Sequence, residues 1–239
     1  MKVILFGGSG MVGRGVLREC LIDPEVTRVL AIGRSRTGTA HEKLREIVLS
    51  DVGDLAPIEG DLRGYDACFW CLGVSSVGMT EPEYRRVTFD LTLRAARTLA
   101  ALNPGLTFVY VSGAGTDSTE RGRSMWARVK GQTENALLHL PFHAAYMFRP
   151  GVIQPRHGIR SKTRAYRVVY AILAPFLFLV RLVSPNSMTS TDRVGRAMIV
   201  VAREGTASPI VSTGQINALA TGPPARDALE ASVPPEQAS

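Results

Sequence analysis

The chain has few cysteines and no apolar run long enough to cross a membrane. Its three cysteines, Cys20, Cys68 and Cys71, are an odd number, which argues against a disulfide-stapled secreted scaffold. No signal peptide is expected, because the apolar stretch at residues 2–6 is short and leads directly into glycines. The main apolar stretch, 168–180, has thirteen residues and is interrupted by Pro175, whereas a membrane-spanning helix needs about twenty. These absences favour a protein of the reducing cytoplasm.

Acidic residues are absent from a long internal segment. Between 135 and 191 there is no Asp or Glu, although the segment holds seven of the 28 Lys and Arg residues. The rest of the chain is therefore neutral, and the net charge of +7 comes from this segment. Such a patch favours an anionic partner, namely a phosphorylated cofactor, an acidic substrate or a membrane surface; an arginine-rich solvated surface is the alternative. Nucleic acid is not an expected partner, because no basic run carries interleaved aromatics.

What is present is a regular alternation of short apolar strands and amphipathic helices. Hydrophobic residues make up 45% and charged residues 21%, as in a globular domain. The alternation predicts an α/β fold with a doubly wound, mainly parallel sheet covered on both faces. Expected strands are 2–6, 27–32, 47–49, 67–72, 107–112, 143–148 and 208–212, and expected helices are 11–21, 81–102, 125–140 and 190–204.

One domain is predicted over residues 1–220. Within it, 152–205 is expected to form a small helical element on the substrate side of the sheet, as the C-terminal part of such folds usually does. The stretch 221–239 is rich in Pro, Ala and Ser, so we expect a disordered tail.

A glycine-rich loop joins the first strand to the first helix. The sequence FGGSGMVGRG places three glycines at a spacing of three residues, directly between a predicted strand and a predicted helix. Glycines allow a sharp turn and a close approach to a pyrophosphate, and the helix N-terminus offers free N–H groups to it. The pattern predicts a dinucleotide site that includes Gly7, Ser9, Gly10, Met11, Val12 and Gly13.

The end of the second strand lacks the acid that an NAD site usually has. The sequence there is AIGRSR, with Arg34 at the tip and Ser35 beside it. A carboxylate would hold the ribose hydroxyls of NAD, whereas a guanidinium can pair with the 2′-phosphate of NADP. NADP(H) is therefore the predicted cofactor, and Arg14 can add to the same positive field. Asp51, after the third strand, is expected near the adenine, with a simple turn residue as the alternative.

Taken in order along the chain, these motifs resemble those of the short-chain dehydrogenase/reductase superfamily. The match is to its atypical and extended branches, which include NAD-dependent epimerase/dehydratase-like and TIP30-like proteins with the Rossmann fold. It covers roughly residues 1–155 and includes the glycine loop, FWCLG, YVSGAG, RVKGQTENAL and FRPGV.

The resemblance implies roles for several further residues. Cys71, Leu72 and Gly73 correspond to the strand end that lines the cofactor's ribose. Lys130 corresponds to the lysine that binds the nicotinamide ribose, and Ser112 lies near the place of the catalytic serine, although Ala114 competes with it for that position. The loop that passes the nicotinamide corresponds to Pro150, Gly151 and Val152, directly after Arg149.

The chain departs from the family at its proton donor. Trp126 stands four residues before Lys130, on the same helix face, where the family has a tyrosine. An indole N–H is only a donor and does not titrate usefully, so it cannot act as a general acid or base. Tyr84, Tyr110 and Tyr146 are the remaining tyrosine candidates, and the apolar surroundings of Tyr110 and Tyr146 favour core positions.

Two functions follow from this departure. The first is an NADP(H)-binding, reductase-like oxidoreductase that acts on a small apolar or acidic substrate with a non-standard active site. The second is a non-catalytic NADPH-binding sensor.

The basic and apolar segment 160–183 leaves several structural readings open. It can form a buried helix pair, a wall of the substrate pocket, a homodimer face or a peripheral membrane contact.

No metal site is predicted. Cys68 and Cys71 have a C-x-x-C spacing, but residues three apart in a strand point to opposite faces of the sheet. We expect both cysteines to be buried as small apolar residues.

Overall fold

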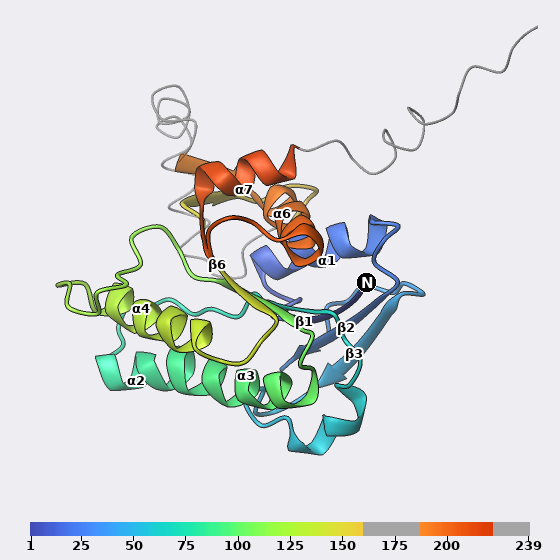
Figure 1. The fold of residues 1–239 in the computed structure, drawn as a ribbon, viewed down its shortest axis with the longest axis horizontal. Coiled ribbons are helices and arrows are strands. Elements are labelled where there is room, and N and C mark those ends of the chain that lie inside the picture. The colour runs from blue at the N-terminus through green and yellow to red at the C-terminus, as the bar shows by residue number, and fades with distance from the viewer. Residues whose placement is uncertain (160–186, 222–239) are drawn as a thin grey trace, which may run out of the picture.

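A seven-stranded parallel sheet forms the centre of the protein in the computed structural model, which describes residues 1–159 and 187–221 (Figure 1). Its order is β3-β2-β1-β4-β5-β6-β9, and every neighbouring pair is parallel. The strand order reverses between β1 and β4, which is where doubly wound sheets bind ligands at their carboxyl edge. The strands are β1 (Lys2–Phe6), β2 (Arg28–Gly33), β3 (Leu44–Val48), β4 (Ala67–Trp70), β5 (Thr107–Val111), β6 (Ala144–Arg149) and β9 (Ile210–Ser212).

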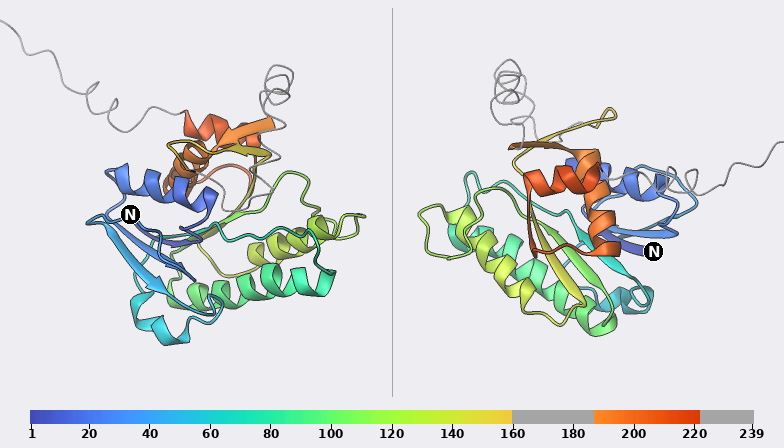
Figure 2. Two further views of the ribbon diagram at one scale, coloured as in Figure 1. Left: turned by 180° about the vertical axis from the view of Figure 1, so that it is seen from behind. Right: turned by 45° about the horizontal axis from the view of Figure 1, so that its top comes forward.

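Helices cover both faces of this sheet (Figures 1 and 2). One layer contains α1 (Met11–Ile22), α6 (Thr191–Glu204) and α7 (Thr213–Ala220). The other contains α2 (Glu81–Arg85), α3 (Leu91–Leu102) and α4 (Met125–Leu138). Side chains alternate along β1, so that Val3 and Leu5 enter one core while Ile4 and Phe6 enter the other. The predicted doubly wound fold is confirmed.

Several boundaries differ from the sequence prediction. Strand β3 begins at Leu44 rather than 47, because its polar residues pair with β2 despite lacking an apolar run. The predicted helix 81–102 is one helical run with a π-turn, η2 (Arg86–Asp90), between α2 and α3. Four elements of the structure are not among the predicted ones: the 3₁₀ helix η1 (Ala56–Asp61), the helix α7, and the short parallel pair β7 (Val152–Gln154) and β8 (Met188–Ser190).

The region predicted as a substrate-side element, 152–205, is divided in the structure. Helix α6 packs against α1 and contributes Val194, Met198 and Val201 to the core of that layer. It therefore belongs to the main helical layer, and β7 and β8 form a separate small sheet. The apolar segment 160–183 and the predicted tail after Thr221 lie outside the described residues. Among the described helices, none combines the length and hydropathy that a bilayer crossing requires.

Candidate cofactor and active site

The glycine loop follows β1 and lies against the end of β4. Gly7 has φ +81°, in the left-handed region, and a Cβ there would lie 2.8 Å from the backbone carbonyl of Cys71. A Cβ on Gly13 would lie 2.1 Å from the carbonyl oxygen of Gly7. Both positions therefore require glycine, and the loop is closed by a 2.9 Å bond from the Gly10 N–H to the Gly7 carbonyl.

The loop leaves the N-terminus of α1 without a side-chain cap. The N-cap residue is Gly10, no side chain accepts a hydrogen bond there, and the first turn contains no acidic residue. Met11, Val12 and Gly13 form that first turn. The free N–H groups and the positive end of the helix dipole thus face the crevice with no built-in carboxylate to compete with an anion. These features fit the predicted pyrophosphate site.

The end of β2 brings positive charge next to the glycine loop. Arg34 is exposed and forms no hydrogen bond or ion pair within residues 1–159 and 187–221. The Ser35 hydroxyl donates to the Ser9 hydroxyl at 3.2 Å, which ties the β2 end to the glycine loop. Arg14 has a buried Nε atom with no hydrogen-bond partner. The arrangement leaves the Arg34 guanidinium available for an anionic ligand.

Asp51 is held in a turn after β3. Its carboxylate accepts a hydrogen bond from the Gly53 N–H at 2.9 Å and forms an ion pair of 2.9 Å with Arg94. The Gly53 and Arg94 contacts hold the pKa of the Asp51 carboxyl below its usual range. Asp51 therefore lies in a turn, and the expected contact of its carboxylate or of the neighbouring backbone with an adenine stays a prediction.

The end of β4 lies directly beside the glycine loop. The Cys71 N–H donates to the Phe6 carbonyl at 3.0 Å, and Leu72 and Gly73 follow at the edge of the sheet. Cys68 packs in one core, and Cys71 packs against the other, so the prediction that they face opposite sides is confirmed. Burial raises the pKa of both thiols, so neither is suited to act as a thiolate nucleophile.

Lys130 and Ser112 lie together at the carboxyl end of β5. The Lys130 ammonium donates to the Ser112 carbonyl. Burial of that ammonium lowers the pKa of Lys130 to about 8, although the Glu134 carboxylate one turn away opposes the shift. The Ser112 side chain is also buried, at 7% exposure, and its hydroxyl donates to the Phe148 carbonyl at 3.0 Å. Ala114, the competing position, is exposed in the following loop.

Trp126 covers the loop that follows Ser112. Its indole ring lies against Gly115, where a Cβ would be 3.4 Å from the ring. It is partly buried and lies one turn before Lys130 on α4. The face of α4 toward the carboxyl edge thus carries an indole, an ammonium and a carboxylate at successive turns, Trp126, Lys130 and Glu134.

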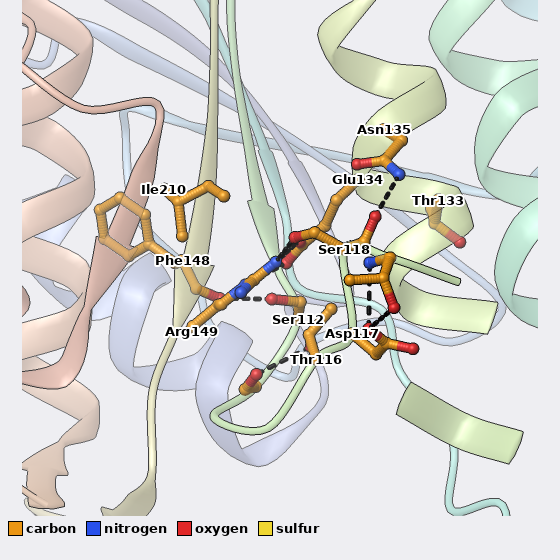
Figure 3. A network of polar contacts seen from close by, with 12 residues as sticks. Ser112, Thr116, Asp117, Ser118, Thr133, Glu134, Asn135, Phe148, Arg149 and Ile210 are labelled. Atoms are coloured by element: carbon orange, nitrogen blue, oxygen red, sulfur yellow. Dashed lines mark hydrogen bonds and ion pairs between the residues drawn. The ribbon is translucent and has the colours of Figure 1, made fainter. Parts of the chain in front are cut away.

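A buried ion pair anchors this face of α4 (Figure 3). Glu134 has a side chain with 0% exposure and pairs with Arg149 at the end of β6. The Arg149 Nε lies 3.1 Å from each carboxylate oxygen, and its Nη2 donates to Glu134 and to the Ser118 hydroxyl. Glu134 is not among the residues predicted to have a role at the site. The sequence shows only a glutamate one turn after Lys130. The partner of Glu134, Arg149, lies fifteen residues later on strand β6.

The loop after Arg149 is held by helix α7. The Thr213 hydroxyl accepts a hydrogen bond from the Gly151 N–H at 2.8 Å and donates to the Arg149 carbonyl at 3.3 Å. The Ala114 N–H donates to the Pro150 carbonyl at 2.8 Å. Pro150, Gly151 and Val152 therefore lie beside the loop that Trp126 covers, as expected for residues that border one site.

The alternative tyrosines are not placed to replace the missing proton donor. Tyr110 is 1% exposed, and burial raises the pKa of its hydroxyl, which hydrogen-bonds to Thr133. Tyr84 is 2% exposed. The Tyr146 hydroxyl accepts a hydrogen bond from the Thr206 N–H at 3.4 Å, on the α6 side of the sheet. The core position of Tyr110 is thus confirmed, whereas Tyr146 is partly buried and packs against the edge of the core.

Comparison with known proteins identifies relatives of similar size. No family profile matches the chain. "Protein fmp52, mitochondrial" of Emericella nidulans is 28% identical over 207 residues, covering 83% of this chain and 85% of the relative. "Protein HTATIP2" of Rattus norvegicus is 29% identical over 155 residues, or 64% of this chain and 62% of the relative. "Leucinostatins biosynthesis cluster protein T" of Purpureocillium lilacinum is 29% identical, and this chain spans about half of it, 51%.

Solved structures with the same fold are more distant in sequence. A short-chain dehydrogenase family protein of Francisella tularensis has a TM-score of 0.62 and 14% identity, covering 87% of this chain and 94% of that one. MoeE5, solved in complex with UDP-glucose and NAD, has a TM-score of 0.64 and 18% identity, covering 92% and 81%. The resemblance found in the motifs is confirmed as a similarity: the sequence is similar to HTATIP2 and to the FMP52 proteins, and the Rossmann fold is shared with a solved short-chain dehydrogenase family protein.

Proposed function

We propose that this protein binds NADP(H) along the carboxyl edge of its sheet and acts as a reductase-like oxidoreductase of the atypical short-chain dehydrogenase type. The observation that carries the proposal is the uncapped N-terminus of α1 next to Arg34, which is exposed and has no ion-pair partner in the described part of the chain. The first feature suits a pyrophosphate, and the second suits the 2′-phosphate that distinguishes NADP from NAD.

The order of the strands supports an extended dinucleotide in one orientation. Ser35 and Arg34 lie after β2 and border the adenosine end, together with the turn at Asp51. The glycine loop after β1 comes next, followed by Cys71 to Gly73 after β4. Lys130 and the loop 150–152 border the nicotinamide end. MoeE5 and the enzyme WbmF of Bordetella bronchiseptica, which share the fold, were solved with NAD.

The chain's own residues define what chemistry this site supports. The nicotinamide cofactor, when bound, supplies or accepts a hydride. Lys130 offers a partly buried ammonium to the ribose, and the loop 150–152 positions the ring. Trp126 cannot exchange a proton, and the side chains of Tyr84 and Tyr110 are buried in the protein. In this proposal the proton of a reduction comes from water or from the substrate, and not from a tyrosine.

A non-catalytic NADPH sensor is the second candidate, and Trp126 favours it. The indole ring lies against Gly115, beside the position that a substrate carbonyl would need. In this alternative, the indole ring fills the substrate side of the site. The bound cofactor then acts by changing the conformation of the covering loops.

The proposed substrate is a small apolar molecule with an acidic group, because a basic rim and an apolar segment occur together in the C-terminal third. We propose a cytoplasmic location, although the FMP52 relatives are named as mitochondrial. The proposals of homodimerisation and of peripheral membrane contact rest on 160–183, outside the described residues.

The test is the affinity for NADPH and NADH, measured by calorimetry on the wild type, on Arg34→Ala and on Arg97→Ala. Arg97 is an equally exposed arginine on α3, away from the crevice, and serves as the matched control. We expect the wild type to bind NADPH at least about tenfold more tightly, and Arg34→Ala alone to lose that preference. Equal affinities in the wild type would remove the phosphate argument.

A further inference from the structure

A carboxylate lies in the pocket that would receive the adenosine phosphate. The pocket is lined by Gly8 and Ser9 of the glycine loop, by Ser35 and Arg36 after β2, and by Glu46 on β3. The Glu46 side chain is only 13% exposed. Ser35, which follows Arg34 in the chain, and Arg36 thus share this pocket with a negative charge.

Backbone contacts hold Glu46 in this position. Glu46 pairs with Ala31 across the β2–β3 ladder, and its Oε1 accepts a hydrogen bond from the Thr37 N–H at 2.6 Å. The carboxylate is therefore fixed beneath the segment that follows β2. An NAD site normally takes its acid from the end of the second strand. Here the acid comes from the neighbouring strand, so the usual spacing rule does not detect it.

Arg36 is a weak partner for this carboxylate. Its closest nitrogen is 3.8 Å from Glu46, and its side chain is 76% exposed. An exposed pair at this distance holds the guanidinium loosely, because solvent screens it and side-chain entropy opposes it. Arg36 can therefore turn toward a phosphate in the pocket, while the Thr37 hydrogen bond keeps Glu46 in place.

We infer that Glu46 sets the degree of cofactor selectivity: its fixed charge disfavours the 2′-phosphate, and Arg36 offsets that repulsion. The inference rests on the proposed NADP(H) site. A phosphate and a carboxylate in a partly buried pocket repel each other more strongly than they would in water. NADH carries a neutral hydroxyl at the same position and avoids the repulsion. The preference for NADPH over NADH should then be smaller than it would be if Arg34 alone determined it.

The experiment compares NADPH and NADH affinities for the wild type, Glu46→Gln, Arg36→Gln and the double variant. Glu46→Gln keeps an oxygen for the Thr37 N–H and removes only the charge. We expect it to strengthen NADPH binding about fivefold and to change NADH binding less than about twofold. Arg36→Gln should weaken NADPH binding by a similar factor, and the double variant should lie near the wild type. Glu42→Gln, an exposed change of equal charge outside the pocket, should have no effect.

The outcomes separate this inference from the proposed function. If Glu46→Gln leaves the NADPH/NADH ratio unchanged while Arg34→Ala abolishes the preference, Glu46 is only a brace for the loop and the inference is overturned. If the wild type binds neither nucleotide, the proposed function itself fails. Thermal melting shows whether Glu46→Gln folds. If Glu46→Gln does not fold, the Arg36→Gln variant is the test. The inference requires that Arg36→Gln weaken NADPH binding but not NADH binding.

Discussion

Glu134 and Arg149 join helix α4 to the end of β6 through a two-pronged ion pair in which the carboxylate is fully buried. The pair ties together the two elements that carry the candidate nicotinamide site, Lys130 on α4 and the loop after Arg149. Figure 3 shows it next to Ser112 and Ser118, between the carboxyl ends of the strands and α4. This contact stabilises the geometry of the site without requiring any ligand.

Removing the charge of Glu134 should destabilise the protein. Glu134→Gln leaves the Arg149 guanidinium, which is 19% exposed, without a counter-charge. We expect the free energy of unfolding, measured by urea denaturation, to fall by about 3 kcal/mol. The control is Glu204→Gln in the surface pair with Arg203, where the loss should stay below about 1 kcal/mol. Equal losses of unfolding free energy in the two variants would show that the buried pair contributes no more to stability than the surface pair.

The lowered pKa of Lys130, about 8, predicts a specific pH dependence of stability. Between pH 8 and about 10.4, Lys130 is protonated in the unfolded chain but largely neutral in the folded protein. Burying the ammonium therefore lowers the free energy of unfolding by its full amount below pH 8. This loss of stability disappears as the pH rises from 8 to about 10.4. Compared with Lys130→Met, the wild type should gain about 2 kcal/mol of unfolding free energy between pH 7 and pH 10. If the difference in unfolding free energy between the wild type and Lys130→Met is the same at pH 7 and pH 10, the Lys130 ammonium is not buried as described.

Restoring the missing tyrosine tests whether the site is a modified enzyme. Trp126→Tyr places a titratable hydroxyl one turn before Lys130, whose ammonium would favour the tyrosinate. We expect NADPH-dependent reduction of carbonyl compounds to rise by about 100-fold or more over the wild type. Trp126→Phe, which opens the same space without a hydroxyl, is the control and should show no such gain. No activity in either variant, with cofactor binding intact, would favour the sensor.

The close approach at Gly13 predicts that even a methyl group damages the cofactor loop. Gly13→Ala places a Cβ against the Gly7 carbonyl, so the loop must move away from the α1 N-terminus. NADPH affinity should fall at least about tenfold. Gly60→Ala, where no heavy atom lies within 4 Å of the new Cβ, should bind normally. Normal NADPH binding by a folded Gly13→Ala protein would mean that the pyrophosphate does not use this loop.

Much of the fold is readable from the sequence because the central strands are buried on both faces. Runs such as 3–6 and 108–111 are therefore apolar throughout, and the helices between them have regular apolar spacing. β3 is harder to read, since Arg45 and Glu46 interrupt it and only pairing with β2 defines its start. Helix α7 has a local start signal in the sequence, the capping box of Ser212 and Gln215.

The site is readable only where it depends on local sequence. The glycine loop and Arg34 follow one another within the first two strands, so their roles can be inferred from spacing. Glu134 and Glu46 act through partners on other elements, and no local pattern connects them to the crevice. The buried hydroxyl of Ser112 likewise depends on β6, whose Phe148 carbonyl accepts its hydrogen bond.

The most direct test of the whole account is a crystal structure of the protein soaked with NADP⁺. We expect the pyrophosphate to lie on the N–H groups at the start of α1, with the 2′-phosphate within hydrogen-bond distance of Arg34. If the site stays empty at saturating NADP⁺, or is filled by the protein's own side chains, the proposed cofactor site is wrong. Only the description of the fold would then hold.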